Sequence, residues 1–175
     1  TAEFGNQELQ LGTVVINAAE EKASERTASV LEIEEGAPVY RIKRLRSLEG
    51  SPVVLQTSLL PALKFPGLLA FDLERESLFE LLKRRYGQRL HRADEYLECA
   101  PGDARWAKLL QVDDTHPLLQ LTRMTYNQDD EIVEVAYSYI PGDLCRFRFN
   151  LGRRSDIEIH YIPRHASPDR PRRAR

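Results

Sequence analysis

The chain has 175 residues, of which 42% are hydrophobic and 30% are charged, and its formal net charge at pH 7 is −2. This length and composition fit one globular domain that buries its own core. Residues 164–175 hold five arginines and one aspartate, a net charge of +4, so the remainder of the chain carries −6. A mildly acidic folded part argues against nucleic-acid binding by this chain alone, because phosphate contacts need a basic surface.

The sequence shows no sign of a membrane span, a secretion signal or a metal site. No apolar run approaches the ~18 residues of a membrane span, and no signal-peptide pattern opens the chain. Cys99 and Cys145 lie in no metal-ligand or redox spacing, so we expect inert, buried thiols in a cytoplasmic protein without cofactors. Because the only methionine is Met124, we expect the chain to be part of a longer protein.

The first 37 residues contain one predicted strand and one predicted helix. Residues 1–10 are polar and lack periodicity, which indicates a linker or an expression remnant. Residues 11–16 are rich in valine and isoleucine and predict a strand. Asn17-Ala-Ala-Glu20 has the form of a capping box and predicts a helix from there to about Leu31.

Residues 38–61 are two β-rich runs around Glu49-Gly50-Ser51 and predict a β-hairpin. One strand face begins apolar and becomes cationic at Arg44 and Arg46, whose Cα atoms lie roughly 7 Å apart. At that spacing two guanidinium groups can converge on one phosphate or carboxylate. The alternative is a solvated strand face, since surface arginine is common.

An apolar irregular stretch after Pro61 predicts a loop that packs onto the core. Ser77-Leu-Phe-Glu80 then has the form of a capping box and predicts a helix that ends at Gly87. The N-terminus of this helix offers free amides to an anion, or Ser77 simply caps the helix.

The second half repeats the same order of elements. Residues 88–99 predict a strand, and Asp103 starts a short helix whose Trp106 faces the core. In the hairpin that follows, Glu134 lies among apolar neighbours, where a position at the rim of the sheet is the simplest explanation. Residues 146–151 predict a further strand. Residues 163–175 form a basic tail that we expect to be disordered, and weak contact with DNA or RNA is its alternative role.

An internal duplication relates the two hairpins. Residues 31–45 align with 110–124 at an offset of 79, which becomes 80 after one extra residue in the second turn. Two copies are too few for a solenoid, so we interpret them as halves of one sheet. Arg123 matches Arg44, whereas Thr125 matches Arg46, so only the first copy carries the cationic pair. This asymmetry predicts one ligand site.

The order of short motifs resembles a known family. These are Gly36-x-Pro-Val-Tyr-Arg-Ile-x-Arg-Leu-Arg46, Gly50-x-Pro52, Ser77-Leu-Phe79, Tyr86-Gly87, Glu134, Ser138 and Gly142-Asp143. Together they resemble the UTRA ligand-sensing domain of GntR-family regulators, HutC subfamily, which we place at residues 11–162. The resemblance implies an α+β fold like chorismate lyase, with a central antiparallel sheet flanked by helices. It also implies a homodimer that senses a small anionic metabolite, such as a sugar phosphate or an organic acid. Operator DNA would be bound only by a winged helix-turn-helix domain that is absent from this chain.

The resemblance also assigns ligand-binding positions, which are Arg44, Arg46, Gln56, Ser77, Phe79, Glu134 and Ile140. The two arginines match those that hold the phosphate or carboxylate, and Ser77 matches a serine that assists them. Ile140 replaces a tyrosine of the family pattern, which argues against an amino-sugar phosphate. The resemblance further favours a three-residue turn over a two-residue turn, because only the former places Arg44 opposite Gln56.

Three functional classes remain open on the sequence: a sensor domain of a transcription regulator, a lyase-like enzyme acting on a small aromatic carboxylate, and a plain oligomerisation module. The four histidines are scattered and supply no nucleophile with a base. A fold shared with a lyase does not establish an activity. The oligomerisation module leaves Arg44 and Arg46 without a role, so the sensor is the preferred interpretation.

Overall fold

The computed structural model describes residues 12–150 and 156–161. The strands are β1 (Gly12–Lys22), β2 (Pro38–Leu48), β3 (Ser51–Pro61), β4 (Arg92–Ala100), β5 (Leu118–Tyr126), β6 (Ile132–Pro141), β7 (Cys145–Asn150) and β8 (Asp156–Tyr161). The helices are α1 (Glu25–Leu31), α2 (Leu78–Tyr86) and α3 (Ala104–Leu110), with short 3-10 turns η1 (Ala62–Lys64) and η2 (Leu68–Ala70). The predicted α+β class is confirmed. In this described part, no helix is long and apolar enough to cross a membrane.

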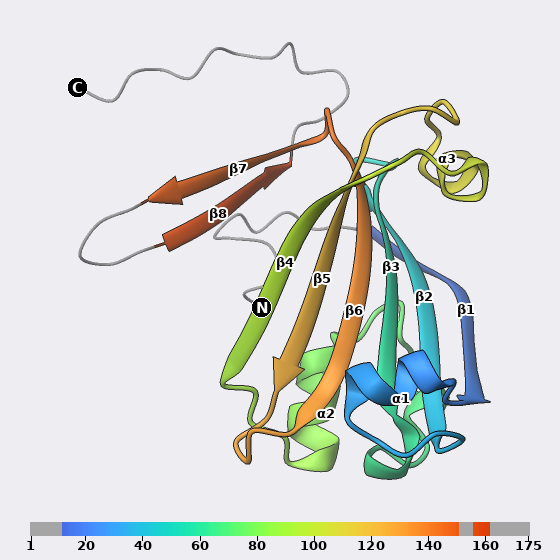
Figure 1. Ribbon diagram of the computed structural model, residues 1–175, viewed down its shortest axis with the longest axis vertical. Helices are drawn as coiled ribbons and strands as arrows, with labels where there is room; N and C mark the ends of the chain where they lie inside the picture. Colours follow the sequence, from blue (N-terminus) through green and yellow to red (C-terminus); the bar gives the residue numbers. More distant parts are fainter. Residues whose placement is uncertain (1–11, 151–155, 162–175) are drawn as a thin grey trace.

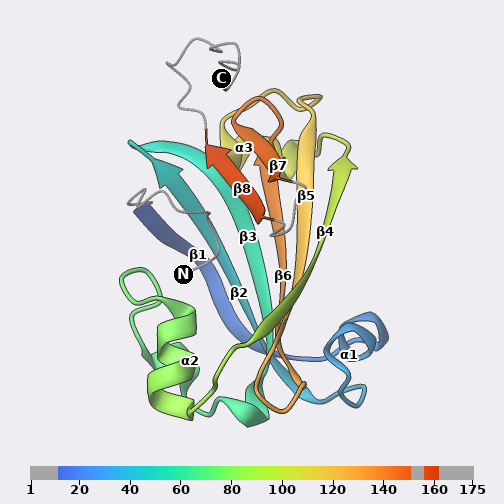
Figure 2. The ribbon, with the colours of Figure 1, turned by 90° about the vertical axis from the view of Figure 1, so that its left-hand side faces the viewer.

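A six-stranded antiparallel sheet forms the centre of the molecule, in the order β1-β2-β3-β6-β5-β4 (Figure 1). Strands β7 and β8 pair with each other in a separate two-stranded sheet. Helix α2 lies on one side of the large sheet and α1 on the other (Figure 2). We call these the α2 face and the α1 face.

The predicted duplication is visible in the sheet. The two hairpins, β2–β3 and β5–β6, meet where β3 pairs with β6, and each has an outer strand and a helix in the matching place. Helices α1 and α3 both end at a left-handed residue, Glu32 (φ 54°) and Gln111 (φ 55°). Thr57 lies opposite Tyr137, its partner at the offset of 80, so a pseudo-twofold axis passes through this pair.

Both faces of the sheet are packed. On the α2 face, Ile42 and Leu60 contact Leu81 and Leu82 of α2 in one apolar cluster. The predicted apolar loop contributes Phe65, Leu68 and Leu73 to the same cluster, as expected from its composition. On the α1 face, α1 and α3 cover separate clusters. Burial of each large apolar side chain stabilises the fold by about 1.5–3 kcal/mol.

The helix predicted from Asn17 is wrong in its first half. Residues up to Lys22 continue β1 and pair with β2 as far as Pro38, with a bulge between Val15 and Asn17. Pairing along the whole of β2 outweighs the helix preference of the alanine-rich segment, because tertiary contacts override local propensity. The helix starts after Ser24, whose hydroxyl accepts a hydrogen bond from the Thr27 amide at 3.3 Å.

The first hairpin combines both of the turns considered. Glu49 and Gly50 form a two-residue turn with positive φ angles of 50° and 80°, and Leu48 lies opposite Ser51, so the predicted three-residue turn is wrong. A bulge between Arg46 and Ser47 then shifts the register by one residue. Arg44 therefore lies opposite Gln56, as predicted.

The remaining differences concern element ends. Strand β4 begins at Arg92, four residues later than predicted, and β8 was not predicted at all. The signal for β8 is the alternation of Ile157 and Ile159 with polar residues. Both cysteines were predicted to be buried. Cys145 is buried, but Cys99 is exposed on the edge strand β4, so the prediction is wrong for Cys99. The predicted linker (1–10) and basic tail (163–175) lie outside the described residues.

Candidate functional site

A row of polar side chains crosses the α2 face of the sheet. Arg44 on β2 lies opposite Gln56 on β3, and Gln56 lies opposite Ser138 on β6. Because directly opposite residues of an antiparallel sheet share a face, the three side chains project to the same side. Arg44 and Gln56 are only 3% and 4% exposed. Arg44 is therefore part of the interior, and Arg46 beside it is half-buried, so the predicted cationic face is not a solvated strand face.

One amide holds this row together. Gln56 Oε1 accepts hydrogen bonds from Arg44 Nη2 at 2.9 Å and from Arg46 Nη2 at 3.3 Å. Gln56 Nε2 donates to Ser138 Oγ at 3.3 Å. Gln56 thus brings two guanidinium groups to one acceptor oxygen. Ser138 was absent from the predicted ligand-binding set, although its alignment with Ser58 in the duplication marked it.

Three further polar groups are buried on the same part of the sheet. Glu134 is fully buried and lies opposite Thr125, so the predicted rim position is wrong. The Ser58 and Thr125 hydroxyls are also buried, and neither has a hydrogen-bond partner among the described residues. Buried hydroxyls are nearly always paired, and these two are therefore candidates for contact with a bound molecule.

The other predicted site residues are placed less centrally. Ser77 is the N-cap residue of α2, but its exposed side chain makes no capping hydrogen bond, so the predicted capping box is wrong. Phe79 packs against the α2 cluster and is half-buried. Ile140 is buried in the apolar cluster with Val54 and Leu144, so its side chain offers packing and no polar contact.

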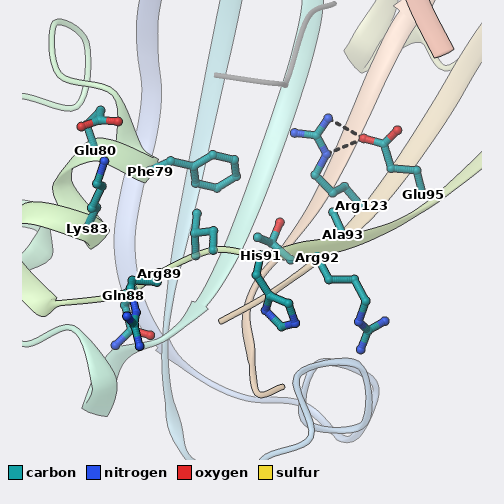
Figure 3. A pocket seen from close by; sticks show the side chains of 12 residues that line it. Phe79, Glu80, Lys83, Gln88, Arg89, His91, Arg92, Ala93, Glu95 and Arg123 are labelled. Atoms are coloured by element: carbon teal, nitrogen blue, oxygen red, sulfur yellow. Dashed lines mark hydrogen bonds and ion pairs between the residues drawn. The ribbon is translucent and has the colours of Figure 1, made fainter. Parts of the chain in front are cut away.

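A cavity of about 560 Å³ lies between α2 and the outer strands β4 and β5. Phe79 is the one predicted site residue that lines it, and it faces the sheet, where Arg123 and Glu95 are joined (Figure 3). Arg123 Nε donates to Glu95 Oε1 at 2.5 Å. Thr125 also lines this cavity, which we call the outer cavity. The sequence marked Arg123 and Thr125 only as partners of Arg44 and Arg46 in the duplication.

A smaller cavity of about 350 Å³ lies on the opposite face, between α1 and α3. Its lining includes Arg26, Arg41 and Tyr137, and Trp106 stacks on Tyr139 with ring centres 3.8 Å apart. Desolvation raises the pKa of Tyr139. Arg41 is already paired with Glu21 at 2.7 Å. Trp106, which was predicted to face the core, is half-buried and stacks on Tyr139 at the edge of this cavity.

Comparison with known proteins agrees with the fold and with the motifs. Residues 6–146 match the family model of the UTRA domain. The chain is 35% identical over 142 residues to the HTH-type transcriptional repressor PhnF of Mycolicibacterium smegmatis, a match that covers 81% of this chain and 57% of that protein. It is 25% identical to the HTH-type transcriptional repressor NagR of Bacillus subtilis, over 81% of this chain and 54% of NagR.

Among solved structures, the effector domain of PhnF from Mycobacterium smegmatis superimposes with a TM-score of 0.72 at 34% identity, over 76% of this chain and 82% of that one. The chain thus spans little more than half the length of the two curated relatives but most of an isolated effector domain. The match to the family model covers well over half of the sequence. The chain therefore belongs to the UTRA domain family.

Proposed function

We propose that this chain is the effector-binding domain of a transcriptional repressor and that it senses a small anionic metabolite. The observation that carries the proposal is the buried Arg44–Gln56 pair, with Arg46 bonded to the same amide oxygen. A buried cation is costly unless a charge or a hydrogen-bond network compensates it. A phosphate or carboxylate that joins this network gains two charge-assisted contacts, which are about twice as strong as neutral hydrogen bonds.

The same row argues for binding in preference to catalysis. Its members are two arginines, an amide and a hydroxyl, which fix an anion but supply no nucleophile with an adjacent base. The Ser138 hydroxyl accepts a hydrogen bond from the Gln56 amide, and none of the row's members is a histidine that could take its proton. His91 lies beside Asp130 and His116 beside Asp143, both away from the row. We therefore propose a sensor and not a lyase-like enzyme.

The relatives suggest how sensing is coupled to DNA. PhnF and NagR are HTH-type transcriptional repressors, and this chain spans 57% and 54% of their lengths. In this proposal operator DNA is contacted by a further domain of the full protein, and the domain described here pairs two copies. A ligand held between α2 and the sheet alters DNA affinity only if it binds two arrangements of the dimer differently.

Mass spectrometry of small molecules that co-purify with the chain, followed by a thermal-shift screen, tests the proposal. We expect phosphorylated sugars or organic acids to raise the melting temperature, because a ligand that binds only the folded state stabilises it. The matching neutral sugars are the control and should have no effect. If no acid shifts the melting temperature, the proposed sensor function is wrong. Conversion of chorismate by the chain would instead establish the enzyme.

A further inference from the structure

We propose that the outer cavity binds a second acidic group of the effector and that Arg123 is the residue that recognises it. This inference rests on the proposed function, in which Arg44 and Arg46 hold the first acidic group. The effector class then narrows to compounds with an acidic group at each end, such as sugar bisphosphates or dicarboxylates.

Arg44 on β2 and Arg123 on β5 project from the same face of the sheet. The pairing runs from Arg44 through Gln56 and Ser138 to Leu121, and Arg123 is two residues beyond Leu121 on β5. Three strand spacings across and two residues along place the two Cα atoms about 16 Å apart. In this proposal, an effector with an acidic group at each end bridges this separation, which the reach of the two long arginine side chains shortens.

The lining of the outer cavity favours an anion. The residues that line it include three cations, Lys83, Arg89 and Arg123, against the two carboxylates of Glu80 and Glu95. An independent observation comes from Thr125, which lines the same cavity, is 3% exposed and has a hydroxyl without a hydrogen-bond partner among the described residues. Phosphate and carboxylate oxygens accept hydrogen bonds, so an acidic group held by Arg123 can accept one from the Thr125 hydroxyl.

The ion pair between Arg123 and Glu95 is suited to exchange. The Arg123 side chain is 12% exposed, whereas the Glu95 side chain is 32% exposed and belongs to the edge strand β4. Glu95 can therefore turn into solvent and be hydrated there, while Arg123 stays on the cavity wall. A ligand phosphate or carboxylate that replaces Glu95 meets the same planar guanidinium and keeps its charge compensated.

Two phosphorylated probes that differ by one phosphate test this inference. Calorimetry on the whole chain compares fructose 1,6-bisphosphate with fructose 6-phosphate. We expect Arg123→Ala to weaken the bisphosphate about tenfold, which is ~1.4 kcal/mol, and to leave the monophosphate nearly unchanged. Glu95→Gln should strengthen the bisphosphate, because it removes the competing carboxylate. Arg105→Ala, which removes an exposed cation on α3, is the matched control and should change neither affinity.

The outcomes separate this inference from the proposed function. The alternative is that the Arg123–Glu95 pair only joins β4 to β5. In that case Arg123→Ala and Glu95→Gln should have effects of the same sign as each other, on the bisphosphate and on the monophosphate alike. That result overturns the inference. It is also overturned if the unmodified chain does not bind the bisphosphate at millimolar concentration. In contrast, Arg44→Ala should weaken both probes. If Arg44→Ala weakens neither probe while Arg123→Ala weakens the bisphosphate, the proposed anion site at Arg44 is wrong.

Discussion

Replacement of Arg44 by alanine tests the central part of the site. The guanidinium group is 3% exposed and donates to Gln56 Oε1 at 2.9 Å. A hydrogen bond to a charged group contributes about 1.5–3 kcal/mol, so we expect an anion bound by this group to lose that amount, or roughly 10–150-fold in affinity. Arg44→Lys should restore only part of the loss, because an ammonium group cannot reproduce the planar fork.

Because Arg44 is buried, Arg44→Ala should also change the stability of the protein without ligand. From the sequence alone, we expect little change in stability, because removal of one of two neighbouring like charges relieves repulsion. In the structure, however, Arg44→Ala also removes the shorter of the two bonds to Gln56 Oε1 and leaves space in a packed interior. We expect a net loss of about 1–3 kcal/mol in the free energy of unfolding, or about 2–12 °C in melting temperature for a chain of this size.

Urea unfolding gives the stability of the empty chain, and calorimetry with fructose 6-phosphate gives the affinity. Arg46→Ala is the informative companion, because Arg46 is half-buried and its bond to Gln56 is longer, at 3.3 Å. It should cost less stability than Arg44→Ala but a similar amount of affinity. If both alanine variants fold and bind the phosphate as tightly as the unmodified chain, the polar row is structural, and our reasoning about it fails.

Three further predictions concern assembly, DNA and the thiols. Sedimentation equilibrium should give a mass of twice 20.1 kDa at tens of micromolar, and a monomer there would contradict the proposed dimer. A mobility-shift assay at physiological salt should show no nanomolar, sequence-dependent DNA binding by this chain, since its part outside residues 164–175 carries −6; such binding would show that the DNA-reading surface lies here. Iodoacetamide at pH 8 should modify the exposed Cys99 well before Cys145, because burial raises the pKa of the Cys145 thiol to about 11, which leaves about one thiolate in a thousand at that pH. Equal labelling rates would mean that β7 opens freely.

The duplication made most of the sheet predictable from the sequence. Once residues 31–45 align with 110–124, the second hairpin must repeat the first, and the centre of the sheet follows. The α2 helix was also predictable, since Leu78, Leu81 and Leu82 form an apolar stripe that ends at Gly87. These signals are local or periodic, and they do not depend on knowing which distant segments meet.

Features that depend on distant contacts were not predictable. Residues 17–22 have a helical composition but form a strand because β2 offers a full-length partner. Glu134 follows the ordinary alternation of β6, and nothing local indicates that both neighbouring strands and the α2 side enclose it completely. The link between Arg123 and Glu95 joins residues 28 positions apart, and neither residue alone distinguishes an ion pair from a free cation.

The asymmetry of the duplication gives a reason for the proposed single site to draw on both halves of the chain. A pseudo-twofold axis at Thr57 and Tyr137 maps Arg44 onto Arg123, so both repeats direct an arginine to the α2 face. In the first repeat Arg46 adds a second cation, and Gln56 holds the two together. In the second, the position of Arg46 is taken by Thr125 and that of Gln56 by Ala136. The second arginine turns instead to Glu95 on the edge strand. Because α2 covers this face and lies in only one of the repeats, the α2 face carries two arginines with different partners, Arg44 bonded to Gln56 and Arg123 paired with Glu95.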